Sequence, residues 1–371
     1  MPYGSVLTDS ITDSSGGVLA PSSSVFRNRI INGAMVIDQR NAGAEVNPAV
    51  NGAYYLDRWA VQSTQTSKFK IGQNAGSVTP PVGYSKYLGC TSLSAYSVTS
   101  TDVFTVQQRI EGLNVADLAW GTASAATVTI SFWVYSSLTG TFGGALRNSD
   151  NTRTYPFSYT ISAANTWELK SVTIAGDTSG TWLTTNGTGI VLNFSLGTGS
   201  TYSGTAGSWS GTDYRSATGA TSVVGTNGAT FYITGVQLEK GSTATSFDYR
   251  PYGTELQLCQ RYYYRLTDGI VGVRFGNGLN INTTTAYIIT PFVVAMRTRP
   301  TALEQSGTAA DYSLLTSGAT TITCSAVPTF SSSSSIMGEN AFTVASGLTA
   351  GQACIGRFAS TTAYLGWSAE L

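Results

Sequence analysis

The sequence contains no histidine. That absence excludes every catalytic triad that uses an imidazole, every histidine general base and every histidine metal site. Charged residues are also scarce: they make up 11% of the chain, with 20 basic and 20 acidic side chains and a formal net charge of zero. Because phosphate binding needs clustered lysine and arginine, we do not expect this chain to bind nucleic acid.

Cysteine pairs and long apolar runs are missing as well. The four cysteines, Cys90, Cys259, Cys324 and Cys354, form no CxxC pair, so the ligand spacing of a zinc site is absent. No apolar run approaches the ~20 residues of a membrane-spanning helix, and the start MPYGSVLTDS lacks the pattern of a secretion signal. We therefore expect no membrane insertion.

What the chain does contain is a series of short strand patterns. Residues 127–135 (TVTISFWVY) alternate between apolar and polar side chains, and residues 189–196 (GIVLNFSL) repeat that pattern. Turn signals such as 176–180 (GDTSG) and Asn186-Gly187 lie between such segments. Many short strands at this spacing predict an all-β fold of antiparallel sandwiches rather than alternating strands and helices.

The stretch from Phe231 to Leu266 divides the chain into two folded units. Its apolar strand pattern ends near Lys240, and Pro251 then interrupts the chain because it lacks a donor and restricts Arg250. A new β pattern begins at residues 262–264. We predict a linker segment at 1–26, a β-sandwich at 27–250 and a second antiparallel β-sandwich domain at 251–371. Cutting the chain near residue 252 should release two separately folded domains.

Two blocks of the sequence carry a resemblance. Residues 235–263 (GVQLEKGSTATSFDYRPYGTELQLCQRYY), and residues 27–44 (RNRIINGAMVIDQRNAGA) followed by 54–59 (YYLDRW), resemble segments of tailed-bacteriophage tail-fibre and receptor-binding proteins. The closing SAEL also fits. The resemblance implies a jelly-roll domain like that of carbohydrate-binding modules, a homotrimer, and a virion location after assembly in the host cytoplasm. Residues 1–26 would then attach to other tail or capsid proteins, and the four thiols would be free in a reducing cytosol.

The sequence shows no residue pattern that is typical of catalysis or of a bound metal ion. Without histidine, glycan cleavage would need two carboxyl groups about 5 to 10 Å apart, yet the acidic residues form no DxD or ExxE pair. Jelly-roll modules often hold a structural calcium ion, but no loop here has the spacing of a calcium site. We expect a protein that is not an enzyme and that carries no cofactor or metal.

A glycan-binding site requires the faces of aromatic rings beside uncharged hydrogen-bond donors. The candidates are Trp133 and Tyr135 on the polar face of the clearest strand, and Tyr202, Trp209 and Tyr214 in the long segment 197–230. The alternative is that any one of them, Trp133 above all, is covered by another layer or by a neighbouring subunit. We expect Trp209 and Tyr214 to lie outside the core, where alanine would leave folding intact and reduce adsorption.

Together, the residues and the resemblance predict a tail-fibre or receptor-binding protein that attaches to a host-surface glycan. If residues 1–26 face the particle, the segment 197–230 and the C-terminal domain are the candidate recognition surfaces. A capsid-borne fibre or decoration protein with a mainly structural role is the alternative, and a polysaccharide depolymerase is a further one. The sequence does not identify the receptor.

Overall fold

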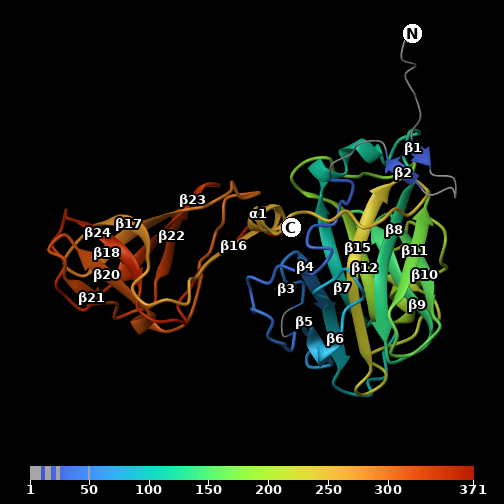
Figure 1. Cartoon of the computed structure of the whole chain (residues 1–371), viewed down its shortest axis with the longest axis horizontal. Coiled ribbons are helices and arrows are strands. Elements are labelled where there is room, and N and C mark those ends of the chain that lie inside the picture. The colour runs from blue at the N-terminus through green and yellow to red at the C-terminus, as the bar shows by residue number, and fades with distance from the viewer. Residues whose placement is uncertain (1–9, 13–17, 22–25, 49–50) are drawn as a thin grey trace, which may run out of the picture.

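The computed structural model describes residues 10–12, 18–21, 26–48 and 51–371. Within these residues the chain consists almost entirely of antiparallel strands, with one α-helix between two β-rich regions (Figure 1). The all-β prediction, a jelly-roll sandwich followed by a second antiparallel β domain, is confirmed. Most of the predicted attachment segment 1–26 lies outside the described residues. Its described parts, β1 (Ser10–Thr12) and β2 (Val18–Pro21), pair as a small antiparallel hairpin.

The first region is a sandwich of two sheets that face each other across one core (Figure 1). The six-stranded sheet contains, in spatial order, β10 (Thr154–Ile161), β9 (Gly140–Arg147), β12 (Thr188–Thr198), β7 (Val103–Glu111), β4 (Trp59–Ser63) and β3 (Tyr54–Leu56). The five-stranded sheet contains β11 (Glu168–Ile174), β8 (Val128–Ser136), β15 (Thr230–Lys240), β6 (Leu88–Ser92) and β5 (Phe69–Gln73). Two short parallel strands, β13 (Ser203–Gly204) and β14 (Ser216–Ala217), lie in the segment that leads to β15.

The alternation read from the sequence explains this core. On β8 the side chains of Val128, Ile130, Phe132 and Val134 are all fully buried. They meet the apolar face of β12, where Phe194 packs edge-on against Phe132 with ring centroids 4.9 Å apart. Each strand therefore turns one face to the core and leaves the other free for polar side chains.

The C-terminal region has its own core and two further sheets. One sheet contains β16 (Tyr263–Leu266), β25 (Leu365–Ser368) and β19 (Glu304–Gln305). The other contains β21 (Thr321–Thr323), β20 (Tyr312–Thr316), β24 (Ala353–Phe358), β17 (Arg274–Asn280), β18 (Thr285–Pro291), β23 (Met337–Thr343) and β22 (Thr329–Ser333). Five 3-10 turns complete the described elements: η1 (Ala75–Ser77), η2 (Gly112–Asn114), η3 (Ala116–Leu118), η4 (Ser200–Tyr202) and η5 (Ala309–Asp311).

Helix α1 (Tyr252–Gln260) joins the two regions, and the C-terminus lies beside it (Figure 1). The helix begins directly after Pro251, which sits at its N-cap position. Cys259 and Tyr262 pack against Ile31 and Ile37 in a small apolar cluster, so the start of the sandwich is covered by residues from beyond position 250.

All four cysteines are free and buried, as expected. Burial raises the pKa of Cys354 to about 11, which keeps this thiol protonated at neutral pH. No helix in the described part of the chain is long and apolar enough to cross a membrane. Among the described residues, no three aspartate, glutamate or cysteine side chains gather into a group that could hold a metal ion.

Candidate functional site

The outward face of the six-stranded sheet carries a polar hollow. Because strand side chains alternate, the residues between the core positions of β4, β7 and β9 point away from the core. At these positions the sequence has Gln62, Gln107, Arg109 and Arg147. The sheet therefore offers amide and guanidinium groups on a rigid backbone, with the core directly behind them.

Strand register brings two of the arginines together. Val191 on β12 lies opposite Arg109 of β7 on one side and opposite Arg147 of β9 on the other. Two strand spacings separate the two arginine backbones, about 9.6 Å, and long side chains easily bridge that span. A third arginine, Arg215, reaches the same area from the residue directly before β14.

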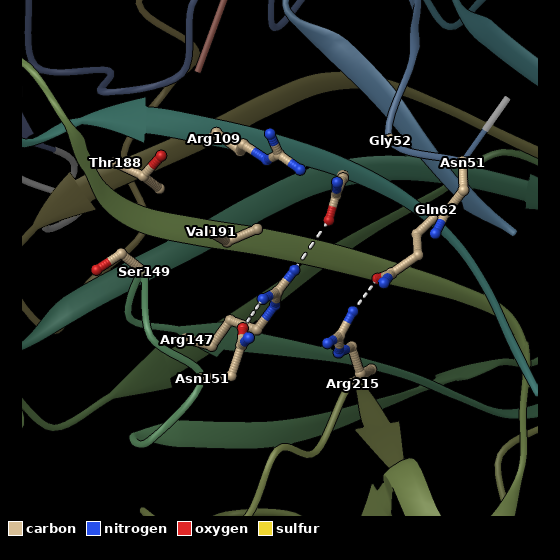
Figure 2. Close-up of a pocket in the computed structure, with 11 residues that line it drawn as sticks. Asn51, Gly52, Gln62, Arg109, Arg147, Ser149, Asn151, Thr188, Val191 and Arg215 are labelled. Atoms are coloured by element: carbon tan, nitrogen blue, oxygen red, sulfur yellow. Dashed lines mark hydrogen bonds between the residues drawn. The ribbon is translucent and has the colours of Figure 1, made fainter. Parts of the chain in front are cut away.

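These groups line a hollow of about 440 Å³ (Figure 2), within the size range of small-ligand sites. Figure 2 shows side chains from β4, β7, β9 and β12, and from the loops that contain Asn51, Asn151 and Arg215, converging over one stretch of sheet. The lining residues are Asn51, Gly52, Gln62, Gln107, Arg109, Arg147, Ser149, Asn151, Thr188, Val191 and Arg215. None of them is acidic, so the hollow lacks the carboxyl pair that glycoside hydrolysis needs.

Arg147 stands at the centre of the hydrogen bonds in the hollow. It donates to Gln107 Oε1 over 3.0 Å and to Asn151 Oδ1. Its Nε is buried and has no partner among the described residues. The side chain is held in place, yet part of its hydrogen-bonding capacity is unused.

The other two arginines have partners of their own. Arg215 donates to both carboxylate oxygens of Asp213, over 2.9 and 2.6 Å, and also to Gln62 Oε1. Arg109 donates to the main-chain oxygen of Leu371. Burial, followed by the positive charge of Arg215, lowers the pKa of Arg147 to about 9. The electrostatic environment of Arg147 is therefore short of negative charge.

The structure divides the five aromatic candidates among separate places. Tyr202 lies beside the hollow, with its ring 5.5 Å from the guanidinium of Arg215. Tyr214 lies in the same segment, close against Gly204. Trp133 and Tyr135 point outward from β8, on the opposite face of the sandwich, where Tyr135 stacks on Tyr232 at 5.3 Å.

Trp209 was expected outside the core, and that expectation is wrong. Its indole packs edge-on against Trp120, Trp182 and Tyr155, with ring centroids 5.2 to 5.5 Å apart. It also donates to the main-chain oxygen of Ala175 over 2.8 Å. The segment 197–230 folds back onto the sandwich and uses this indole to cover the end of the core, so its loss would reduce stability.

The sequence reasoning missed the residues that line the hollow. The local sequence signal for these residues was the alternation of Gln107 and Arg109 with the apolar Val106 and Ile110 on β7. Such a pattern looks the same whether the polar face meets water or a ligand. What distinguishes this face is the arrival of Arg147 and Arg215 from other elements, which no local pattern reveals.

No protein-family model matches the chain, and no curated protein matches it either. Among solved structures it is similar to the enzymatically active domain of tailspike protein 4 from bacteriophage CBA120. That similarity has 12% identity and a TM-score of 0.33, and it covers 59% of this chain but only 22% of the tailspike chain.

Carbohydrate-binding modules are also among the similar structures. The family 11 module of a cellulosomal cellulase from Clostridium thermocellum has 12% identity and a TM-score of 0.26, with 54% of this chain and 98% of the module covered. A xylan-binding domain from Paenibacillus barcinonensis has 10% identity and a TM-score of 0.24, with 55% and 99% covered. The structural neighbours thus include a phage tailspike domain and carbohydrate-binding modules, all at low identity, and no sequence match to a tail fibre was found.

Proposed function

We propose that this protein binds a glycan in the hollow on the outward face of the six-stranded sheet. One observation carries the proposal: buried guanidinium and amide groups converge there on rigid strands, and part of their hydrogen-bonding capacity is unused. A sugar presents hydroxyl and ring oxygens that such donors recognise. Tyr202 adds an aromatic ring beside the hollow.

The wider role we propose is that of a non-catalytic tail-fibre or receptor-binding protein, located in the virion, that attaches to a host-surface glycan. The residue blocks at 27–59 and 235–263 support it by their resemblance to that family. The absence of acidic residues from the hollow lining favours binding over cleavage. We further propose a homotrimer, in which several weak sites act together and gain affinity from being linked.

A glycan array with the full chain tests the binding proposal. We expect selective binding that the double variant Gln62→Ala, Asn151→Ala weakens about tenfold for each hydrogen bond lost. The exposed Gln352→Ala serves as the matched control and should bind like the unchanged protein. Circular dichroism should show the same fold for all three proteins.

Three other outcomes would contradict the proposal. Unchanged binding by the double variant would remove the hollow from the site. A trimer that binds no glycan at all would favour the decoration-protein alternative. Release of reducing sugar ends from a host polysaccharide would identify a depolymerase.

A further inference from the structure

The charge in the hollow suggests which class of glycan it takes, an inference that rests on the proposed function. Three described arginines are buried in this chain: Arg58, Arg147 and Arg215, at 1%, 6% and 7% exposure. Arg58 pairs with Glu370 and Arg215 pairs with Asp213. Arg147 alone among them has no carboxylate within ion-pair distance in the described part of the chain.

A buried guanidinium without a counter-charge is costly, because the protein does not replace the solvation that the cation loses. The nearest charges increase that cost. Burial and the positive charges of Arg215 and Arg109 lower the pKa of Arg147, and only Asp213 acts in the opposite direction. Asp213 itself is engaged by Arg215 through two hydrogen bonds, so it is not free to neutralise Arg147.

The groups around Arg147 are arranged as donors. Gln107 and Asn151 turn their side-chain oxygens to the guanidinium, so the NH₂ groups are the donors that remain on these two side chains. Ser149 and Thr188 add hydroxyl groups to the same lining, and the hydroxyl of Ser149 donates to Asp150 Oδ1 over 3.0 Å. A planar guanidinium that has no carboxylate partner among the described residues, next to amide donors, matches a carboxylate, which only accepts hydrogen bonds.

We propose that the hollow binds the carboxylate of a uronic acid within an acidic polysaccharide, with Arg147 as its ionic partner. The amide and hydroxyl groups of the lining then contact the neutral oxygens of the same sugar. Arg109 and Arg215, each already held by a partner of its own, add a positive field that attracts the anionic chain.

Calorimetric titration of the full chain tests this with matched ligands. The panel contains oligomers of galacturonate, alginate and hyaluronan, each beside its fully methyl-esterified form, in which the carboxylate is neutral and the rest of the sugar is unchanged. We expect at least one free acid to bind about tenfold or more tightly than its ester. Arg147→Gln should abolish that preference and Arg147→Lys should retain part of it, while Arg274→Gln, at an exposed arginine of β17, should leave it unchanged.

The outcomes separate this inference from the proposed function. Equal binding of acids and esters, or binding of neutral glycans only, would overturn the acidic class and leave glycan binding intact. Binding of dextran sulfate without any uronate would overturn the choice of a carboxylate. A preference for the acid that survives in Arg147→Gln, with an unchanged melting temperature, would remove Arg147 as the partner. No binding to any member of this panel or of the array would overturn both proposals.

Discussion

At the scale of single residues, Asp102 shows how one buried carboxylate fixes a loop. It lies directly before β7 and is 3% exposed. Its carboxylate accepts four hydrogen bonds over 2.7 to 2.9 Å. Two come from Thr99, through its main-chain N–H and its hydroxyl, and the other two come from the hydroxyls of Thr64 and Tyr96. Burial alone would raise the pKa of Asp102, but these hydrogen bonds outweigh it and lower the pKa to about 2.

Asp102→Asn should therefore destabilise the sandwich by about 1 to 2 kcal/mol at pH 7, because an amide cannot accept all four bonds. Since the folded pKa lies below the unfolded value of 3.8, this contribution is present above about pH 4 and is lost as the pH falls toward 2. Urea unfolding at several pH values should show the gap to the unchanged protein narrowing on acidification. Asp268→Asn, at an exposed aspartate, is the control, and a gap independent of pH would contradict the assignment.

At the scale of elements, the junction between the two regions is built from buried charges. Arg58, between β3 and β4, pairs with Glu370 near the C-terminus and lies 3.6 Å from the ring of Tyr262. Burial by itself lowers the pKa of Arg58, but the charge of Glu370 outweighs it and raises that pKa. Arg261 and Tyr262, directly after α1, both donate to Glu111 at the end of β7. The end of the chain is thus part of the contact between the regions.

Glu370→Gln should weaken this junction strongly, because it leaves Arg58 buried without a carboxylate. Breaking a buried ion pair from one side costs about 3 to 5 kcal/mol, which denaturant unfolding can measure. Glu304→Gln is the matched control: Glu304 is 47% exposed at its side chain and lies 3.9 Å from Arg40, so its loss should cost less than about 1 kcal/mol. Equal effects of the two variants would contradict the role given to Glu370.

At the scale of the whole molecule, one face of the C-terminal domain is left uncovered by the described residues. On β17 and β18 the alternate residues Ala286 and Ile288 are buried, whereas Leu279, Tyr287 and Ile289 are 37 to 46% exposed. Leu279 lies opposite Tyr287 in the sheet, so the exposed apolar side chains are neighbours. Apolar sheet faces of this kind commonly mark contacts between subunits.

Assembly through this face agrees with the proposed homotrimer, and light scattering can test it. We expect a mass of about 117 kDa, three times the 38.9 kDa of the chain. Ile289→Lys should shift the protein toward the monomer, because it places a charge within the apolar face, whereas Thr321→Lys on the exposed β21 should not. A stable monomer of the unchanged protein at micromolar concentration would contradict the trimer.

Local chemistry in the sequence determined the class of the fold. The alternation in β8 and β12 placed the correct residues in the core, because the two-residue period of a strand is a local property. The break predicted at Arg250-Pro251 falls directly before α1, because the restrictions of proline act on its immediate neighbours. The absence of histidine and of cysteine pairs excluded whole kinds of site before any fold was known.

Only the tertiary structure decided where those elements meet. The hollow joins β4, β7, β9 and the segment before β14 because β12 pairs with both β7 and β9, and sheet order depends on contacts between distant parts of the chain. The same holds for Trp209, which packs against the end of the core, and for Arg58 and Glu370, which are 312 positions apart. A polar side chain on a strand has the same local pattern whether it meets water, a neighbour or a ligand, and only long-range packing distinguishes these cases.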